Sequence, residues 1–357
     1  MESIAKRPCD SLGRYGARFL DRNGAENRDF TGRELLTSRK QWGRVARSLI
    51  LVALLLPLAS VGAVAADGVK GCKPFANFNR AEFQPPTEID NQWFPLRPGT
   101  QFTYVGQADV GDEEPRILPR IVVFTVTDMT KVIDGVETLV AWDQDFAIDE
   151  EGQQFLLEEE LAFFVQDEDG NVWNLGEYPE EFEDGEFAGA PSTWIHHVED
   201  AKGGILVLGR QRRGTEYLEG LVPSIEFFDC GLVYRTLRHL RVRDEDFSNV
   251  LVIRERSPFD PEGGMQQKYY APDEGLIKVD AVGDPEGERL DLLEQVKLGL
   301  GGLAIARQSV KRLESDAYNS EDDRVRTVYG ETEPAQQLPA DDAIASADPF
   351  KMAQASH

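Results

Sequence analysis

Two adjacent histidines, His196 and His197, are the residues whose types best suit catalysis or metal binding. A neutral imidazole can bind zinc or act as a general base near neutral pH. Both residues fall in the predicted strand Ser192–Val198, where successive side chains point to opposite faces. We therefore expect that they cannot bind one ion together unless a bulge intervenes. His239 lies in a basic strand and is expected on its solvated face. Because none of these histidines has a partner at metal-ligand spacing, the sequence predicts no metal site.

Carboxylates are too abundant to identify a catalytic pair, because the chain has 64 acidic residues. Asp143, Asp145 and Asp149, and separately the turn Asp167–Asp169, could offer oxygen ligands to Ca²⁺. Neither run has the glycine and glutamate spacing of an EF-hand. The sequence also has no Gly-x-Ser-x-Gly motif, and Gly299–Gly302 lacks the Lys-Ser/Thr of a phosphate loop. We predict no cofactor and assign no catalytic residue.

Aromatic residues recur on the predicted strands and are the main candidates for a ligand pocket. Their rings could line an apolar cavity, or they could be the ordinary packing of a β core. The pocket candidates are Trp93, Phe102, Tyr104, Trp142, Trp173, Trp194, Tyr269 and Tyr270.

Cys72 and Cys230 could form one disulfide, because the third cysteine, Cys9, lies in the N-terminal leader. A pair in an oxidising compartment favours a bond, and two unpaired thiols are the alternative. Lipidation at Cys72 is disfavoured, since the charged Lys70 stands where a lipidation signal needs a small or apolar residue.

An export signal is the strongest pattern in the sequence. Arg44 and Arg47 precede an apolar run at residues 48–66, which ends in the small-x-small cleavage site Ala63-Val64-Ala65. Pro57 shortens the apolar stretch below the length of a membrane-spanning helix, so a cleaved signal is favoured over an uncleaved anchor. We expect a periplasmic or extracellular protein with no stable membrane span after cleavage. Residues 1–47 would be a disordered leader, or the start is assigned too early.

The formal net charge of −26 excludes one class of partner. Nucleic-acid binding requires clustered basic residues, which occur here only at Arg210–Arg213 and Arg235–Arg243. We therefore predict no nucleic-acid partner.

The elements that position these residues are predicted to be mainly β. Period-two patterns rich in Val, Ile, Phe, Tyr and Trp alternate with turn signals such as Ile133-Asp134-Gly135-Val136, and no βαβ unit is visible. We expect about eleven antiparallel strands over 67–300, as a curved open barrel or a sandwich. The predicted strands are Gln101–Gly106, Arg120–Asp128, Val136–Phe146, Gln154–Gln166, Val172–Leu175, Ser192–Val198, Leu232–Arg243, Val250–Arg256, Gln266–Tyr270, Leu276–Val282 and Arg289–Lys297.

Four other segments are less regular. Gln154–Phe164 also fits a helix turn, but its neighbours favour a strand. The acidic Glu177–Gly189 is predicted to be an exposed loop, and Gly203–Gly209 fits either a buried strand or a loop. A short helix is expected over 301–315. The polar composition of 316–357 predicts a disordered tail.

Three runs carry a resemblance to a protein family, and they are Ile89–Thr100, Asp167–Trp173 and Lys268–Lys278. The chain is similar, over roughly residues 88–297, to an uncharacterised family of exported bacterial proteins. The resemblance implies a single collinear domain and transfers no catalytic residue. Asp273-Glu274 departs from the family pattern, and a weaker fold likeness extends to envelope lipoprotein carriers with a curved open barrel.

These observations favour a non-enzymatic exported module that binds an apolar small molecule, an extended ligand or an envelope partner protein. A secreted hydrolase using carboxylates or His196 and His197 is one alternative. A structural envelope protein is the other.

Overall fold

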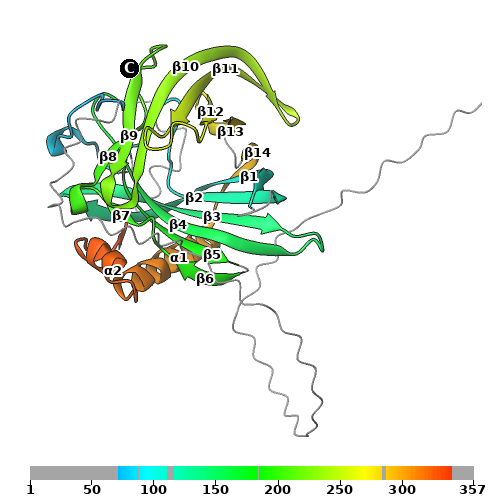
Figure 1. Ribbon diagram of the computed structural model, residues 1–357. Coiled ribbons are helices and arrows are strands. Elements are labelled where there is room, and N and C mark those ends of the chain that lie inside the picture. Colours follow the sequence, from blue (N-terminus) through cyan, green and yellow to red (C-terminus); the bar gives the residue numbers. More distant parts are fainter. Residues whose placement is uncertain (1–70, 87, 111–115, 184, 284–286, 340–357) are drawn as a thin grey trace, which may run out of the picture. The chain divides into compact units, whose positions relative to one another are not determined.

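The computed structural model describes residues 71–339 except 87, 111–115, 184 and 284–286 (Figure 1). The predicted leader, signal segment and residues 340–357 lie outside the described residues. Most described residues belong to β-strands. These are β1 (Thr100–Asp109), β2 (Ile117–Ile133), β3 (Val136–Ile148), β4 (Gln154–Gln166), β5 (Val172–Glu183), β6 (Glu186–Gly189), β7 (Trp194–Ile195), β8 (Lys202–Val207), β9 (Glu216–Val222), β10 (Phe227–Val242), β11 (Glu245–Arg256), β12 (Met265–Ala271), β13 (Gly275–Val282), β14 (Arg289–Lys297) and β15 (Gln336–Gln337).

Twelve of these strands close into one antiparallel barrel. The strand order is β1-β14-β13-β12-β11-β10-β9-β8-β5-β4-β3-β2, and β1 also pairs with β2, which closes the ring. β6 and β7 pair with β5 outside this ring, and β15 pairs with β2. The prediction of a mainly antiparallel β domain is confirmed. The structure is a closed barrel rather than an open barrel or a sandwich.

Turn chemistry sets the register of the hairpin between β2 and β3. Asp134 and Gly135 both have positive φ, 47° and 76°, so that Ile133 pairs with Val136. A two-residue turn with two positive φ values matches the twist of an antiparallel pair, and Asp-Gly suits it. The predicted turn is confirmed, and it fixes the position of the Asp134 side chain.

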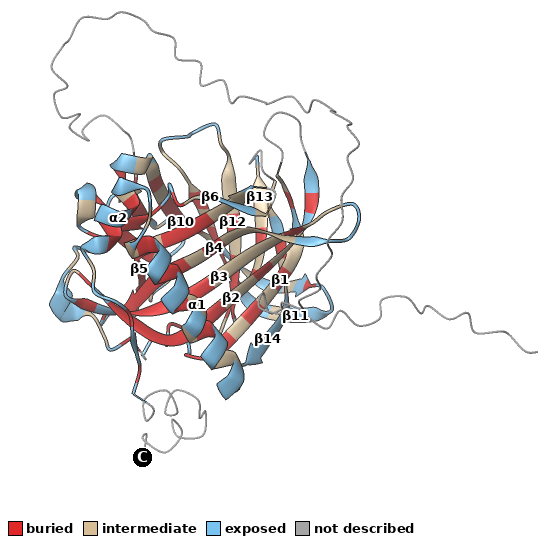
Figure 2. Cartoon of the chain, turned by 90° about the horizontal axis from the view of Figure 1, so that it is seen from below, coloured by how far each residue is buried: buried red, intermediate tan, exposed pale blue. Residues whose placement is uncertain are grey.

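Helix α1 (Leu300–Tyr318) covers the outer face of β2, β3 and β4, and helix α2 (Asp323–Gly330) lies beside α1 and contacts β7 (Figure 2). α1 buries Ala306, Val310 and Leu313, which are spaced at helical intervals. α2 is capped at its N-terminus by Asp322, whose carboxylate accepts hydrogen bonds from the N–H groups of Arg324 and Val325.

The tail therefore differs from the sequence prediction. The helix expected over 301–315 covers 300–318, and residues 319–339, expected to be disordered, contain α2 and β15. α2 has only eight residues, too few for a periodic pattern to stand out, yet it buries Val325, Val328 and Tyr329. Packing against the barrel stabilises a helix that is too short to be stable alone.

The acidic segment Glu177–Gly189 is not the exposed loop that was predicted. β5 continues to Glu183, and Tyr178 is 1% exposed and Glu180 4% exposed. Arg312 of α1 lies 3.5 Å from Glu180 and supplies the charge that makes this burial possible. Gln154–Phe164 forms β4 as predicted, and Gly203–Gly209 contributes β8.

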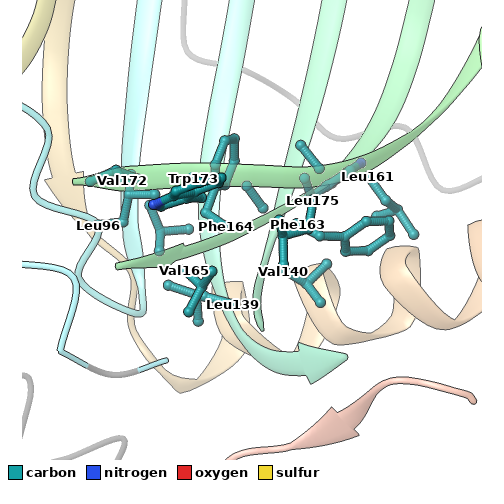
Figure 3. Packing of buried hydrophobic residues seen from close by; sticks show 14 of the residues in the cluster. Leu96, Leu139, Val140, Leu161, Phe163, Phe164, Val165, Val172, Trp173 and Leu175 are labelled. Carbon is teal, nitrogen blue, oxygen red and sulfur yellow. The ribbon is translucent and has the colours of Figure 1, made fainter. Parts of the chain in front are cut away.

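The main hydrophobic cluster fills one part of the barrel and continues outward to the helices. Phe94 contacts Phe124, Phe164 and Tyr270 inside, with ring centroids 5.9–6.4 Å apart. Phe163 points the other way and contacts Tyr329 of α2. Figure 3 shows Phe163, Phe164 and Trp173 within this cluster.

Candidate functional site

A segment before the barrel, Lys73–Phe78, is fixed at both ends and is called the strap here. At one end the Cys72–Cys230 disulfide joins it to β10, which confirms the predicted pair. At the other end the Arg80 side chain contacts both the carboxylate and the backbone oxygen of Asp134 at the β2–β3 turn. The strap therefore lies across the wall of the barrel between two anchors that are far apart in the sequence.

A cavity of about 350 Å³ lies between the strap and the barrel wall. Its lining includes the apolar residues Phe78, Trp173 and Ile205 and the polar pair His196 and His197. The Phe78 ring contacts the His196 ring, with centroids 4.1 Å apart. Glycines on β8 bring the backbone close, because a side chain at Gly204 would overlap the Leu218 carbonyl. The further lining residues are Pro74, Phe75, Ala76, Asn77, Asp200, Ala201, Lys202, Gly203, Gly204 and Leu218.

Trp173 is held rigidly in the cavity wall. Its indole Nε1–H donates to Oδ2 of Asp167 at 2.8 Å, and the same carboxylate accepts from the backbone and side-chain nitrogens of Asn171. Phe78 and Phe83 contact the indole edge-to-face, with centroids 6.1 and 5.6 Å away. The turn considered above as a Ca²⁺ site thus uses its buried carboxylate, Asp167, to position an aromatic wall.

Trp173 is the one predicted aromatic candidate that lines this cavity. Phe102 and Tyr104 stack on each other inside the barrel, whereas Trp142 donates to Glu159 on the outer face. Trp194 and Tyr269 belong to two separate small clusters. Trp93 packs at the edge of the main cluster and Tyr270 is buried within it. The eight residues therefore do not form a single site.

His196 and His197 lie on the same side of the chain, which corrects the expectation of opposite faces. β7 ends at Ile195, and His197 has a left-handed backbone with φ 70°. The two rings stack with centroids 4.6 Å apart and 12° between their planes. The turn replaces strand geometry at this point, so the alternation rule does not apply. Within the described residues these histidines and Asp134 form the one group with metal-ligand spacing.

Asp134 lies close to both rings. Its Oδ2 atom is 3.0 Å from Nδ1 of His197 and 4.0 Å from Nε2 of His196. The contact with His197 lacks the alignment of a hydrogen bond, and the distance to His196 is too long for one. Among the described residues, Asp134 Oδ2 and His196 Nε2 therefore have no hydrogen-bond partner. Sequence reasoning missed Asp134 because 62 residues separate it from His196, and no short-range pattern links them.

A metal ion does not fit this group. The N–H of Gly203 donates to Nδ1 of His196 at 2.8 Å, so a neutral His196 carries its proton on Nε2. Metal-binding histidines normally donate from the second nitrogen instead. Arg80 also occupies the Asp134 carboxylate and would repel a cation. The hydrogen bonding therefore opposes metal binding at His196 Nε2.

Burial controls the charge of the site. Burial chiefly, and then the charges of His197 and Arg80, lower the pKa of His196 from 6.5 to about 4, against the opposing effect of Asp134. Burial raises the pKa of Asp134, but its contacts with Arg80 and the histidines outweigh burial and lower it overall. At neutral pH the site thus holds a neutral His196 beside an ionised Asp134.

The other residues considered from the sequence lie elsewhere. Asp145 pairs with Arg120, and Asp149 caps the β3–β4 turn by accepting from Gln153. Asp143 lies opposite Glu160 and faces the barrel interior. His239 lies on β10, where its ring contacts the Ser248 hydroxyl.

Comparisons with known proteins identify no family and no curated relative. No family model matches the chain, and no curated protein matches it. Two solved structures resemble it weakly. One is a protein from Bacteroides fragilis that is predicted to be exported and has a YmcC-like fold, with a TM-score of 0.33. The other is a predicted lipoprotein from Parabacteroides distasonis, with a TM-score of 0.30. Each is 12% identical and covers 58% of this chain and 100% of its own.

No helix in the part of the chain that the structure describes is long and apolar enough to cross a bilayer.

Proposed function

We propose that this protein is an exported binding module that holds a small ligand with a flat apolar group in the cavity beneath the strap. The supporting observation is the cavity of about 350 Å³ with the aromatic wall Phe78 and Trp173. Small-molecule sites are concave, mostly apolar and usually preformed, with volumes of about 300–1,000 Å³. The two anchors of the strap preorganise this cavity, so little ordering entropy opposes binding.

The polar residues that line the cavity carry charges of both signs, so they favour a ligand with a polar group of either charge or none. Asp200 and Lys202 carry opposite charges at the mouth, and Asn77 offers both a donor and an acceptor. Phe75 is 51% exposed beside them, as expected for a ring that covers a ligand after it enters. A compact aromatic or short-chain compound with one polar group fits this lining.

Fluorescence titration of the mature protein tests the proposal. A panel of small aromatic and short-chain apolar compounds should include one that quenches tryptophan emission saturably. Trp173→Phe should remove most of this quenching, whereas Trp142→Phe should preserve it, because Trp142 lies outside the cavity against Glu159. Equal quenching in both variants, or none across the panel, would refute the assignment.

Affinity measurements provide a second, independent comparison. Phe75→Ala should weaken binding several-fold, because it removes apolar area at the mouth of the cavity. Phe187→Ala is the matched control, since this ring is 57% exposed on β6 and does not line the cavity. Equal affinities of the two variants would contradict the assigned mouth.

A second candidate function is hydrolysis of the ligand with His197 as general base. The specific observation is the 3.0 Å separation of Asp134 and His197, whose side chain is 60% exposed at the cavity. The negative charge of a neighbouring carboxylate favours the protonated form of an imidazole and so favours proton uptake from water. Ester hydrolysis that falls at least a hundredfold in His197→Gln would support this function. Activity retained in that variant would exclude it.

A further inference from the structure

The interior of the barrel carries a set of carboxylates that the cavity beneath the strap does not use. Strand alternation places them inside, because their sequence neighbours face outward. Glu159 contacts Arg312 of α1, so Glu160 faces the interior, and Leu218 packs against the external disulfide, so Glu219 faces the interior. We call this set the inner acidic cluster, and its members are Asp143, Glu158, Glu160, Glu177, Glu219 and Glu255.

On one strand pair, the carboxylates that face outward and those that face inward have different charged neighbours. Glu159 and Glu180 are directly opposite on β4 and β5, and Arg312 lies between them at 2.5 and 3.5 Å. Glu158 and Glu181 are the next opposite pair but face the interior. Opposed like charges on neighbouring strands repel each other unless a cation separates them. At Glu158 the negative charges of Asp143, Glu177 and Glu181 act together, against the opposing charge of Arg120.

The positive charge of one lysine acts on four carboxylates of the cluster. Nζ of Lys268 lies 2.6 Å from Oε2 of Glu255, and its charge also acts on Glu160, Glu177 and Glu219. A single ammonium cannot neutralise four carboxylates. The interior therefore has an excess of negative charge unless protons or another cation compensate it.

Two buried carboxylate oxygens point to a missing ligand. Oε1 of Glu219 and Oε1 of Glu255 have no hydrogen-bond partner among the described residues, and the residues are only 7% and 8% exposed. Buried polar atoms in folded proteins normally have partners. Each of these oxygens could accept a hydrogen bond from an ammonium group.

Solvent reaches the cluster even though it lies inside the barrel. Glu158, Glu160 and Glu177 are only half-buried, and the Lys268 side chain is 23% exposed. A barrel of twelve strands is wider than the eight-stranded barrels whose interior is just filled by side chains. These inward side chains keep accessible surface, so a small solute can contact them.

We propose that the inner acidic cluster binds an organic amine with more than one ammonium group. A single metal ion is a poor fit, because no three carboxylates of this cluster have ligand atoms within 4.8 Å of one another. A flexible polyamine spans larger separations and donates several hydrogen bonds from each nitrogen. The site is distinct from the cavity beneath the strap, so it does not rest on the proposed function above.

Protonation supports the same assignment. Burial, followed by the neighbouring carboxylates, raises the pKa of Glu158 to about 7 and that of Glu219 well above its ordinary range. A bound cation would favour the ionised forms, so amine binding should release protons near neutral pH. A guest attracted only to the exterior would release none.

Isothermal titration of the mature protein with spermidine at pH 7 and 150 mM NaCl tests the proposal. We expect saturable binding with net proton release, measured from the dependence of the heat on buffer ionisation. Glu219→Gln should weaken binding at least tenfold, and Glu160→Gln, from another strand, provides a second variant if the first does not fold. Glu151→Gln is the matched control, because it removes the same charge from an exposed turn.

Three results would overturn the proposal. The first is the absence of saturable heat with spermidine. The second is equal binding by the Glu219→Gln, Glu160→Gln and Glu151→Gln variants, which would indicate diffuse attraction to an acidic protein. Equal competition by Ca²⁺ at matched ionic strength would assign the cluster to metal ions instead. Phe75→Ala should leave spermidine binding unchanged, so failure here and failure of the strap cavity are distinguishable.

Discussion

Lys131 and Glu314 form an ion pair of 2.6 Å that joins β2 of the barrel to helix α1, and the lysine side chain is completely buried. The ammonium also donates to the Tyr318 hydroxyl and the Glu333 carbonyl, and lies 4.4 Å from the centre of the Tyr329 ring. All four partners come from the segment that follows the barrel. The pair therefore ties the C-terminal helices to the sheet.

Removing one member of this pair should destabilise the protein strongly. Lys131→Met leaves Glu314 buried without its cation and should lower the free energy of unfolding by about 3–5 kcal/mol. The double variant Lys131→Met/Glu314→Gln should recover part of this loss, because no uncompensated charge remains. Urea unfolding followed by circular dichroism measures both. A single variant as stable as the wild type would show that the pair contributes little.

Loss of the disulfide should affect stability and the cavity together. The bond closes a separation of 158 residues, so Cys72→Ser/Cys230→Ser should cost up to about 5 kcal/mol on the chain-entropy model. Ligand affinity at the strap cavity should also fall, because the strap loses one anchor. Thermal unfolding and the fluorescence titration check the two effects, with alkylated but unreduced wild type as the control.

His196 should make the protein less stable in mild acid. Its folded pKa of about 4 lies below the unfolded value of 6.5, so the unfolded state binds the proton more tightly. The stabilisation is fully present above pH 6.5 and is lost as the pH falls toward 4, with a total of about 3 kcal/mol. His196→Asn should remove this dependence while its side-chain oxygen still accepts from Gly203. Unfolding free energies of both proteins between pH 4 and 7 give the comparison, and parallel curves would contradict it.

Glu158 should have the opposite dependence on pH. Burial and then Asp143 raise its pKa to about 7, against the opposing charge of Arg120. The folded state therefore holds the proton more tightly, and stability falls as the pH rises from about 4.5 to 7. Glu158→Gln should be more stable than wild type at pH 8 and nearly equal at pH 4. Denaturant unfolding at the two pH values measures the difference, which would not depend on pH if Glu158 titrated normally.

The start of the mature chain is a separate prediction. Signal cleavage after Ala65 would leave Ala66 as the first residue, and Cys72 should carry no lipid because its sulfur is bonded to Cys230. Intact mass and N-terminal sequencing of the exported protein test both. A mass increment of a diacylglyceryl group would contradict the second part.

The sequence by itself determined the local and compositional features. Period-two patterns identified the antiparallel β domain, and the Asp134-Gly135 turn followed from two residues that tolerate positive φ. The Cys72–Cys230 pair followed from counting alone. The excess of acidic residues was visible, but composition does not say which side of a strand a carboxylate occupies.

Only the tertiary structure decided barrel closure and the sites. Closure depends on the pairing of β1 with both β14 and β2, which joins residues almost 200 positions apart. The meeting of Asp134 with His196 and His197 depends on where a strand ends, and that is set by packing rather than by local pattern. Buried Glu180 and the ordered α2 depend on partners from the other end of the chain, so no window of sequence could reveal them.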